Sequence, residues 1–97
     1  MVKVIFPSYM IGKNDNVDLI EYTDALMFCD SKKSILQILS EASKRAPDAF
    51  AKIINDFEIN KGVIIVYNNT ILRYENFEKI IPNDNDTIEI LVQFAGG

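Results

Sequence analysis

The chain has 97 residues, of which 48% are hydrophobic, and this is enough for one compact core but not for two. Fourteen acidic against ten basic residues give a net charge of −4, which disfavours a nucleic-acid-binding role. No apolar run reaches membrane-spanning length, and residues 1–7 lack the pattern of a signal peptide. We therefore expect a single cytoplasmic domain over residues 1–97 that binds neither nucleic acid nor a membrane.

The composition also argues against catalysis by this chain alone. There is no histidine and one cysteine, Cys29, so neither a Cys/His metal site nor a Ser/His/Asp set can be built. Cys29 follows Met27 and Phe28, which favours a buried hydrophobic role over a reactive thiol. Asp84 and Asp86 lie in a turn-like segment that lacks the downstream Glu and central Gly of a calcium loop. We expect no catalytic residue, no metal and no cofactor bound by this chain.

The first elements in chain order have the pattern of strands. Apolar residues occupy every second position of residues 2–6, and Pro7 ends this segment or places it next to an edge. A polar turn at residues 12–16 follows. We expect residues 17–22, together with residues 25–28, to return as the antiparallel partner of the first strand, which makes a hairpin.

Helical spacing then replaces the alternation. Ser34 and Gln37 form a capping-box pair, so Ser34 is the expected N-cap, with Asp30 or Ser31 as alternatives. Pro47 suits the first turn of a second, shorter helix that would extend to Phe57. Each helix has an apolar stripe that must cover a sheet: Ile35, Leu36, Ile38, Leu39 and Ala42 in the first, and Phe50, Ile53, Ile54 and Phe57 in the second.

Strand patterns return in the last third of the chain. Residues 63–67 are apolar on both alternating faces, which predicts an interior strand. Asn68 and Asn69 tolerate positive φ and can form a type I′ turn into residues 70–72. Residues 87–93 are strongly β-prone, and this last strand can lie parallel to the first. The order predicts an α+β protein of the β-grasp type, with a mixed sheet of four to five strands, one main helix and a short second helix.

The sequence ends in Phe94-Ala95-Gly96-Gly97, a tail with almost no side-chain bulk. Glycine lacks Cβ, so a partner enzyme can approach the terminal carboxylate from every side and the backbone can follow a narrow channel. We expect residues 94–97 to be flexible and the Gly97 carboxylate to be open to activation as an acyl-adenylate. The alternative is a frayed terminus without a function.

Most of residues 34–97 resemble the MoaD/ThiS sulfur carriers, which have the ubiquitin-like fold. The matching stretches are Ser34-Ile35-Leu36-Gln37-Ile38-Leu39, Val63 through Asn69, Asp84-Asn85-Asp86-Thr87-Ile88, and Ala95-Gly96-Gly97. The insertion from Pro47 to Phe57 makes the chain most similar to the small subunit of molybdopterin synthase. Asn69 and Asn85 stand where the family usually has Gly, and Val92 and Gln93 stand where many molybdopterin carriers have prolines. Phe94 replaces a small aliphatic residue.

The resemblance implies a function at Gly97. An E1-like adenylating enzyme of the MoeB/ThiF type would use ATP to adenylate the Gly97 carboxylate, and a sulfur donor would displace AMP to leave a thiocarboxylate. In the molybdopterin branch, a larger MoaE-type catalytic subunit would receive the tail and the sulfur. Gly96, Ala95 and Phe94 would position the tail, with Phe94 either an anchor in a partner groove or a core residue at the end of the last strand.

Three other functions stay open from the sequence. The chain could serve thiamine thiazole synthesis, or it could be a ubiquitin-like modifier whose activated Gly97 is attacked by a lysine, although ubiquitin's tail carries arginines and this tail does not. A non-catalytic β-grasp module that binds a protein partner is the third. An exposed apolar face of the sheet would contact partners, and the periodicity leaves open which of Ile64, Val66 or Leu91 faces outward.

Overall fold

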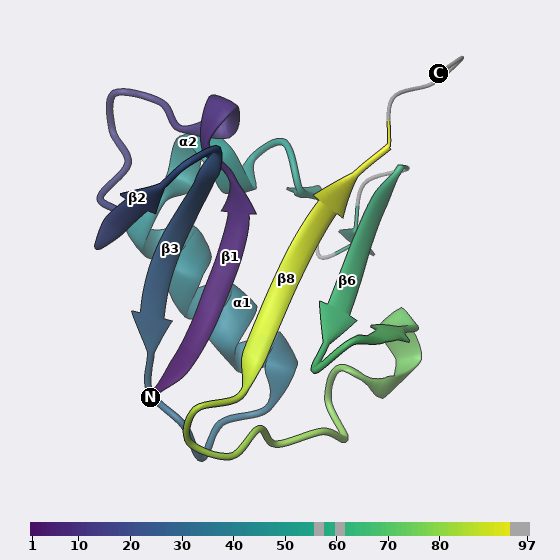
Figure 1. Ribbon diagram of the computed structural model, residues 1–97. Helices are drawn as coiled ribbons and strands as arrows, with labels where there is room; N and C mark the ends of the chain where they lie inside the picture. The colour runs from purple at the N-terminus through teal and green to yellow at the C-terminus, as the bar shows by residue number, and fades with distance from the viewer. Residues whose placement is uncertain (56–57, 60–61, 94–97) are drawn as a thin grey trace.

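The computed structural model describes residues 1–55, 58–59 and 62–93, and its main element is a six-stranded mixed sheet with two helices on one face (Figure 1). The strand order is β2-β3-β1-β8-β6-β7, and only the central pair β1 and β8 is parallel. The expected β-grasp arrangement is confirmed, with six strands in place of four to five. The bounds are β1 (Val2–Pro7), β2 (Leu19–Glu21), β3 (Asp24–Cys29), β6 (Val63–Tyr67), β7 (Thr70–Leu72) and β8 (Thr87–Val92).

The antiparallel partner of β1 is β3, not residues 17–22, so that part of the predicted hairpin is wrong. The shorter β2 pairs with the far side of β3 and forms an edge of the sheet. Ala25, Met27 and Cys29 of β3 are buried in the core, whereas all three residues of β2 are exposed, so β3 takes the interior position beside β1. Residues 17–22 contain Asp18 and Glu21, which suit an edge strand.

Ser34 is the N-cap of helix α1 (Ile35–Arg45), as predicted. The Gln37 amide donates to Ser34 Oγ at 3.2 Å, and the Ser34 amide donates to Gln37 Oε1 at 2.9 Å, which completes the capping box. Lys44 and Arg45 lie in the last turn, where positive charge is favoured by the helix dipole.

The predicted second helix is much shorter than expected. Helix α2 (Pro47–Phe50) has one turn, and β4 (Ile54–Asn55) then pairs with β5 (Glu58–Ile59) in a separate two-stranded sheet. The β-branched pair Ile53-Ile54 and the turn-forming Asn55 disfavour helical continuation, while Phe57 lies outside the described residues. Two 3₁₀ turns complete the elements: η1 (Ser8–Met10) and η2 (Tyr74–Asn76).

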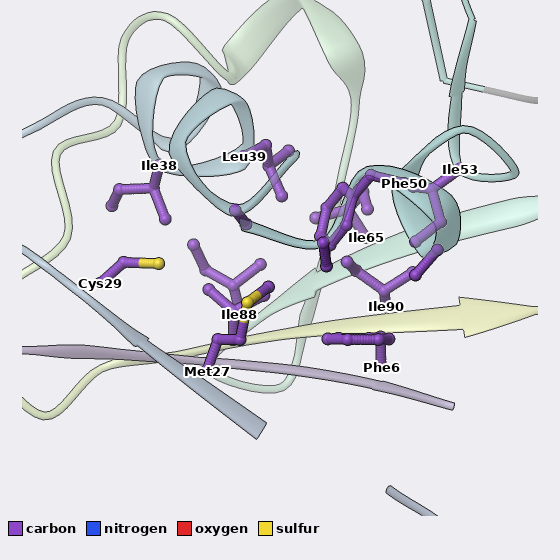
Figure 2. Packing of buried hydrophobic residues seen from close by; sticks show 14 of the residues in the cluster. Phe6, Met27, Cys29, Ile38, Leu39, Phe50, Ile53, Ile65, Ile88 and Ile90 are labelled. Atoms are coloured by element: carbon purple, nitrogen blue, oxygen red, sulfur yellow. The ribbon is translucent and has the colours of Figure 1, made fainter. Parts of the chain in front are cut away.

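The hydrophobic core fills the space between the sheet and the two helices (Figure 2). Ile88 and Ile90 of β8 are almost fully buried beneath α1 and α2, and the rings of Phe6 and Phe50 meet edge to face at 5.6 Å. Cys29 is 1% exposed and packs in this core, which confirms its predicted hydrophobic role. Among the described residues, no helix is long and apolar enough to span a bilayer.

Two asparagines adopt the backbone conformation that glycine usually supplies. Asn69 has φ of 70° in the turn between β6 and β7, and Asn85 has φ of 71° in the turn before β8. Asn68 also has positive φ, as a type I′ turn requires. The predicted tolerance of Asn at these turns is confirmed, and it keeps the last three strands in register.

Ser34→Ala should lower the free energy of unfolding by about 1 kcal/mol, because the Gln37 amide loses its acceptor at the start of α1. Ser34→Gly should cost only a few tenths of a kcal/mol, since glycine leaves the helix end open to water. Urea denaturation of both variants measures the difference. Equal losses in the two variants would contradict a capping role for the Ser34 hydroxyl.

Candidate functional site

The predicted reactive tail follows β8, which lies in the middle of the sheet. Gly97, Gly96, Ala95 and Phe94 lie outside the described residues, so their predicted roles stay predictions. The described chain ends at Gln93, one residue after β8. Because β8 is flanked by parallel β1 and antiparallel β6, the tail follows an interior strand of the sheet rather than an edge strand.

A contact between Gln93 and Gly62 fixes the point where the tail begins. The Gln93 amide donates to the Gly62 carbonyl at 2.7 Å, next to the Val63–Val92 pair. Gly62 has φ of +86°, and a Cβ added there would lie 3.0 Å from the Gln93 carbonyl oxygen. Glycine is therefore required at this position for both its conformation and its size. Gly62 was not among the predicted site residues, although its position immediately before an apolar strand was an available signal.

The fixed start sets the reach of the tail. Four residues span at most about 14 Å when fully extended, so the Gly97 carboxylate can lie no farther than that from Gln93. An enzyme that acts on the carboxylate must therefore dock closely against the end of β8. The rest of the surface near β8 then becomes part of the candidate site.

One face of the sheet carries neither α1 nor α2 in the described part of the chain, and we call it the outer face (Figure 1). Ile71 is 68% exposed and Leu91 is 42% exposed on it, and Ile64 and Val66 are half-buried. All three residues that the sequence left open thus face outward. The outer face consists of Lys3, Ile5, Leu19, Leu26, Phe28, Ile64, Val66, Ile71, Thr87, Glu89 and Leu91.

The one thiol of the chain does not contribute a nucleophile to this site. Burial, together with the nearby Glu41 carboxylate, raises the pKa of Cys29 to about 11. The reactive form of cysteine is the thiolate, so the group stays protonated and inert near neutral pH.

The two carboxylates in the turn before β8, Asp84 and Asp86, already accept hydrogen bonds from other groups of the same chain. Asp84 accepts from the Met1 amino group at 2.8 Å, which holds the pKa of Asp84 below its usual value. Asp86 accepts from the Tyr67 hydroxyl and from the Asn83 amide. The Tyr67 contact lowers the pKa of Asp86 and raises that of Tyr67 to about 12. These side chains hold the turn in place, and the described residues contain no cluster of three or more potential metal ligands.

Another hollow lies on the helical side of the molecule. It measures about 750 Å³ and has one carboxylate, Glu78, in its lining. The other lining side chains are apolar or neutral, so no pair of nucleophile and base is assembled there. The remaining residues of its lining are Leu36, Gln37, Leu39, Ser40, Ser43, Ile54, Ile59 and Tyr74.

Comparison with known proteins extends these observations. The model of the ThiS family matches residues 14–97. The uncharacterized protein ycf40 of Trieres chinensis is 39% identical over 46 residues, which are 46% of this chain and 63% of that protein, so the match spans less than two thirds of that relative.

Solved structures show the same fold at low sequence identity. SAMP1 from Haloferax volcanii matches with a TM-score of 0.66 and 10% identity, over 98% of this chain and 99% of that one. A chain in the BexX/CysO complex of Amycolatopsis orientalis matches with a TM-score of 0.67 and 19% identity, over the full length of both chains. The HVO 2177 protein of Haloferax volcanii matches with a TM-score of 0.63 and 13% identity, over 99% of this chain and 87% of that one.

Gly62→Ala should lower the free energy of unfolding by about 1 kcal/mol, because an alanine at this φ is strained and its Cβ presses on Gln93. The effect should concentrate at the end of β8. Hydrogen exchange of the Gln93 amide should therefore accelerate more than exchange at Ile88, which lies deep in the same strand. Unchanged exchange at Gln93 would show that the Gly62 contact does not hold the start of the tail.

Proposed function

The chain belongs to the ThiS family, and from this premise we propose that it is a sulfur carrier whose reactive group is the Gly97 carboxylate. The single observation that carries the proposal is the position of the Gly-Gly tail, which follows a central strand with a fixed end. A slim tail of limited reach on a rigid body suits delivery of a carboxylate into the channel of a partner enzyme. The chain itself acts as a co-substrate and catalyses nothing alone.

The chemistry proceeds in two steps on the partner enzymes. A Gly97 carboxylate oxygen attacks the α-phosphorus of ATP bound to an E1-like adenylating enzyme, and pyrophosphate leaves. Sulfur from a donor then attacks the acyl carbon, and AMP leaves, since the adenylate oxygen is a far better leaving group than the original carboxylate oxygen. The product is a thiocarboxylate, whose sulfur is a good nucleophile.

We assign the carrier to molybdopterin synthesis, with a larger MoaE-type subunit as the acceptor of the tail. The support is the segment between α1 and β6, which contains α2 and the β4-β5 pair. Its presence makes the domain long, as in the molybdopterin-synthase small subunits that the sequence resembles. The Amycolatopsis orientalis structure is a complex of BexX with CysO, so a chain in that structure with this fold is found with a protein partner. We propose that this chain also works by docking on enzymes.

Deleting Gly97, or adding one alanine after it, should abolish thiocarboxylate formation while leaving the fold intact, because the buried residues that form the described core all precede Gln93. The measurement is intact mass after incubation with the activating enzyme, ATP and sulfide. The unmodified chain should gain the mass of one sulfur minus one oxygen at Gly97. Urea denaturation of each variant serves as the control for folding.

Two outcomes would replace this proposal. Isopeptide-linked adducts through Gly97 without a mass gain would assign the chain as a protein modifier. Binding to a partner that persists unchanged after removal of Gly96 and Gly97, with no modification of the tail, would assign it as a plain binding module. Transfer of sulfur to thiazole rather than to a pterin precursor would keep the carrier function and change the pathway.

A further inference from the structure

A row of side chains crosses the outer face with one carboxylate at its centre. The pairing register places Glu89 of β8 opposite Ile5 on one side and Val66 on the other. Beyond Ile5, the row passes through Leu26 of β3 and Leu19 of β2, and beyond Val66 it ends at Ile71 of β7. All members of the row except Glu89 are therefore apolar. Glu89 is therefore a half-buried charge in the middle of an apolar surface.

Glu89 also lines a hollow on this face. The hollow measures about 310 Å³ and lies between β8 and the β6-β7 turn, with Val66, Asn68, Asn69 and Thr87 as its other walls. The Asn68 side chain is engaged, because its Oδ1 accepts from the Thr87 amide at 2.9 Å. Glu89 is thus the one charged group in the lining, and the hollow is open to solvent on the side where a partner would dock.

Residues 1–55, 58–59 and 62–93 supply no counter-charge to this carboxylate. None of the ion pairs or side-chain hydrogen bonds in the described part of the chain involves Glu89. Lys3 is the cation of the outer face, and it pairs in register with Thr87 rather than with Glu89. Covering a carboxylate with a partner that offers no cation would strongly destabilise the complex, because the charge would be buried unpaired. A partner that covers the outer face must therefore supply a cation for Glu89.

From these observations, and resting on the proposed carrier function, we infer that the Glu89 hollow is the binding site for an arginine or lysine side chain of the enzyme that adenylates the tail. A guanidinium fits best, because its planar donors can bind a carboxylate in a bidentate manner. Apolar side chains of the enzyme would cover Val66, Ile71 and Leu91 around this ion pair.

The adenylating enzyme is the occupant that the geometry favours. Glu89 precedes Gln93 by four residues of extended strand, about 13 Å, and the tail reaches at most about 14 Å beyond. The hollow lies toward the start of β8 and the tail leaves the other end of this strand. An enzyme interface of standard size, about 800 Å² on each partner, is wide enough to cover Leu91 and the hollow together with the start of the tail. A second copy of this chain is disfavoured because each copy carries a net charge of −4.

The test compares Glu89→Gln, Glu89→Lys and Glu75→Gln in titration calorimetry against the purified adenylating enzyme of the same organism. Glu75 is exposed on η2 and is not one of the outer-face residues, so its substitution matches the charge change of Glu89→Gln. We expect the Kd to rise about 10-fold for Glu89→Gln and at least about 100-fold for Glu89→Lys, with no change for Glu75→Gln. Salt should weaken binding of the unmodified chain more than binding of Glu89→Gln.

The outcomes separate this inference from the carrier function. If Gly97 is adenylated but Kd is the same for all three variants, the cation site is wrong and the carrier function stands. If the unmodified chain neither binds the enzyme nor is adenylated, both are wrong. A dimer of the unmodified chain in sedimentation that Glu89→Lys disrupts would overturn the assignment to an enzyme and identify a second copy as the occupant. Glu89→Gln is close in shape to glutamate, so it provides the comparison even if Glu89→Lys fails to fold.

Discussion

The parallel pairing of β1 with β8 is the constraint on which the rest of the structure depends. Val4 of β1 lies opposite Ile88 of β8, so this pair joins the first strand of the chain to the last one. Parallel strands need a long connection between them, and here it is residues 8–86, which contain all the other helices and strands. The pairing buries Ile88 and Ile90 beneath the helices and leaves the tail to start at the centre of the sheet.

The alternation of side chains along β8 links stability to function. Ile88 and Ile90 point into the core, where they are almost fully buried, while Thr87, Glu89 and Leu91 belong to the outer face. The same strand thus holds the fold together, contributes side chains to the outer face and precedes the Gly-Gly tail in the sequence. Because a strand has a period of two, these roles do not compete for the same positions. An enzyme that docks on the outer face would meet a rigid surface supported from beneath by the core.

The prediction from sequence worked where one local signal had one strong physical cause. The Ser34–Gln37 capping box, the positive φ of Asn69 and Asn85, and the burial of Cys29 were all predictable from residue type and neighbours. The prediction failed where several patterns competed. Residues 17–22 and 24–29 both look extended, and the choice of the strand beside β1 depends on which one buries its apolar side chains in the core.

The sequence by itself determined the β-grasp class, the main helix, the interior strand Val63–Tyr67 and the candidate reactive end at Gly97, because these follow from periodicity, capping and the chemistry of glycine. Only the tertiary structure decided that Gly62 holds the start of the tail, that Ile64, Val66 and Leu91 share the outer face, and that Glu89 lies at its centre with no ion-pair partner among the described residues. These features depend on the register between strands distant in the chain. Register is set by how all six strands fit one core, and no local pattern encodes it.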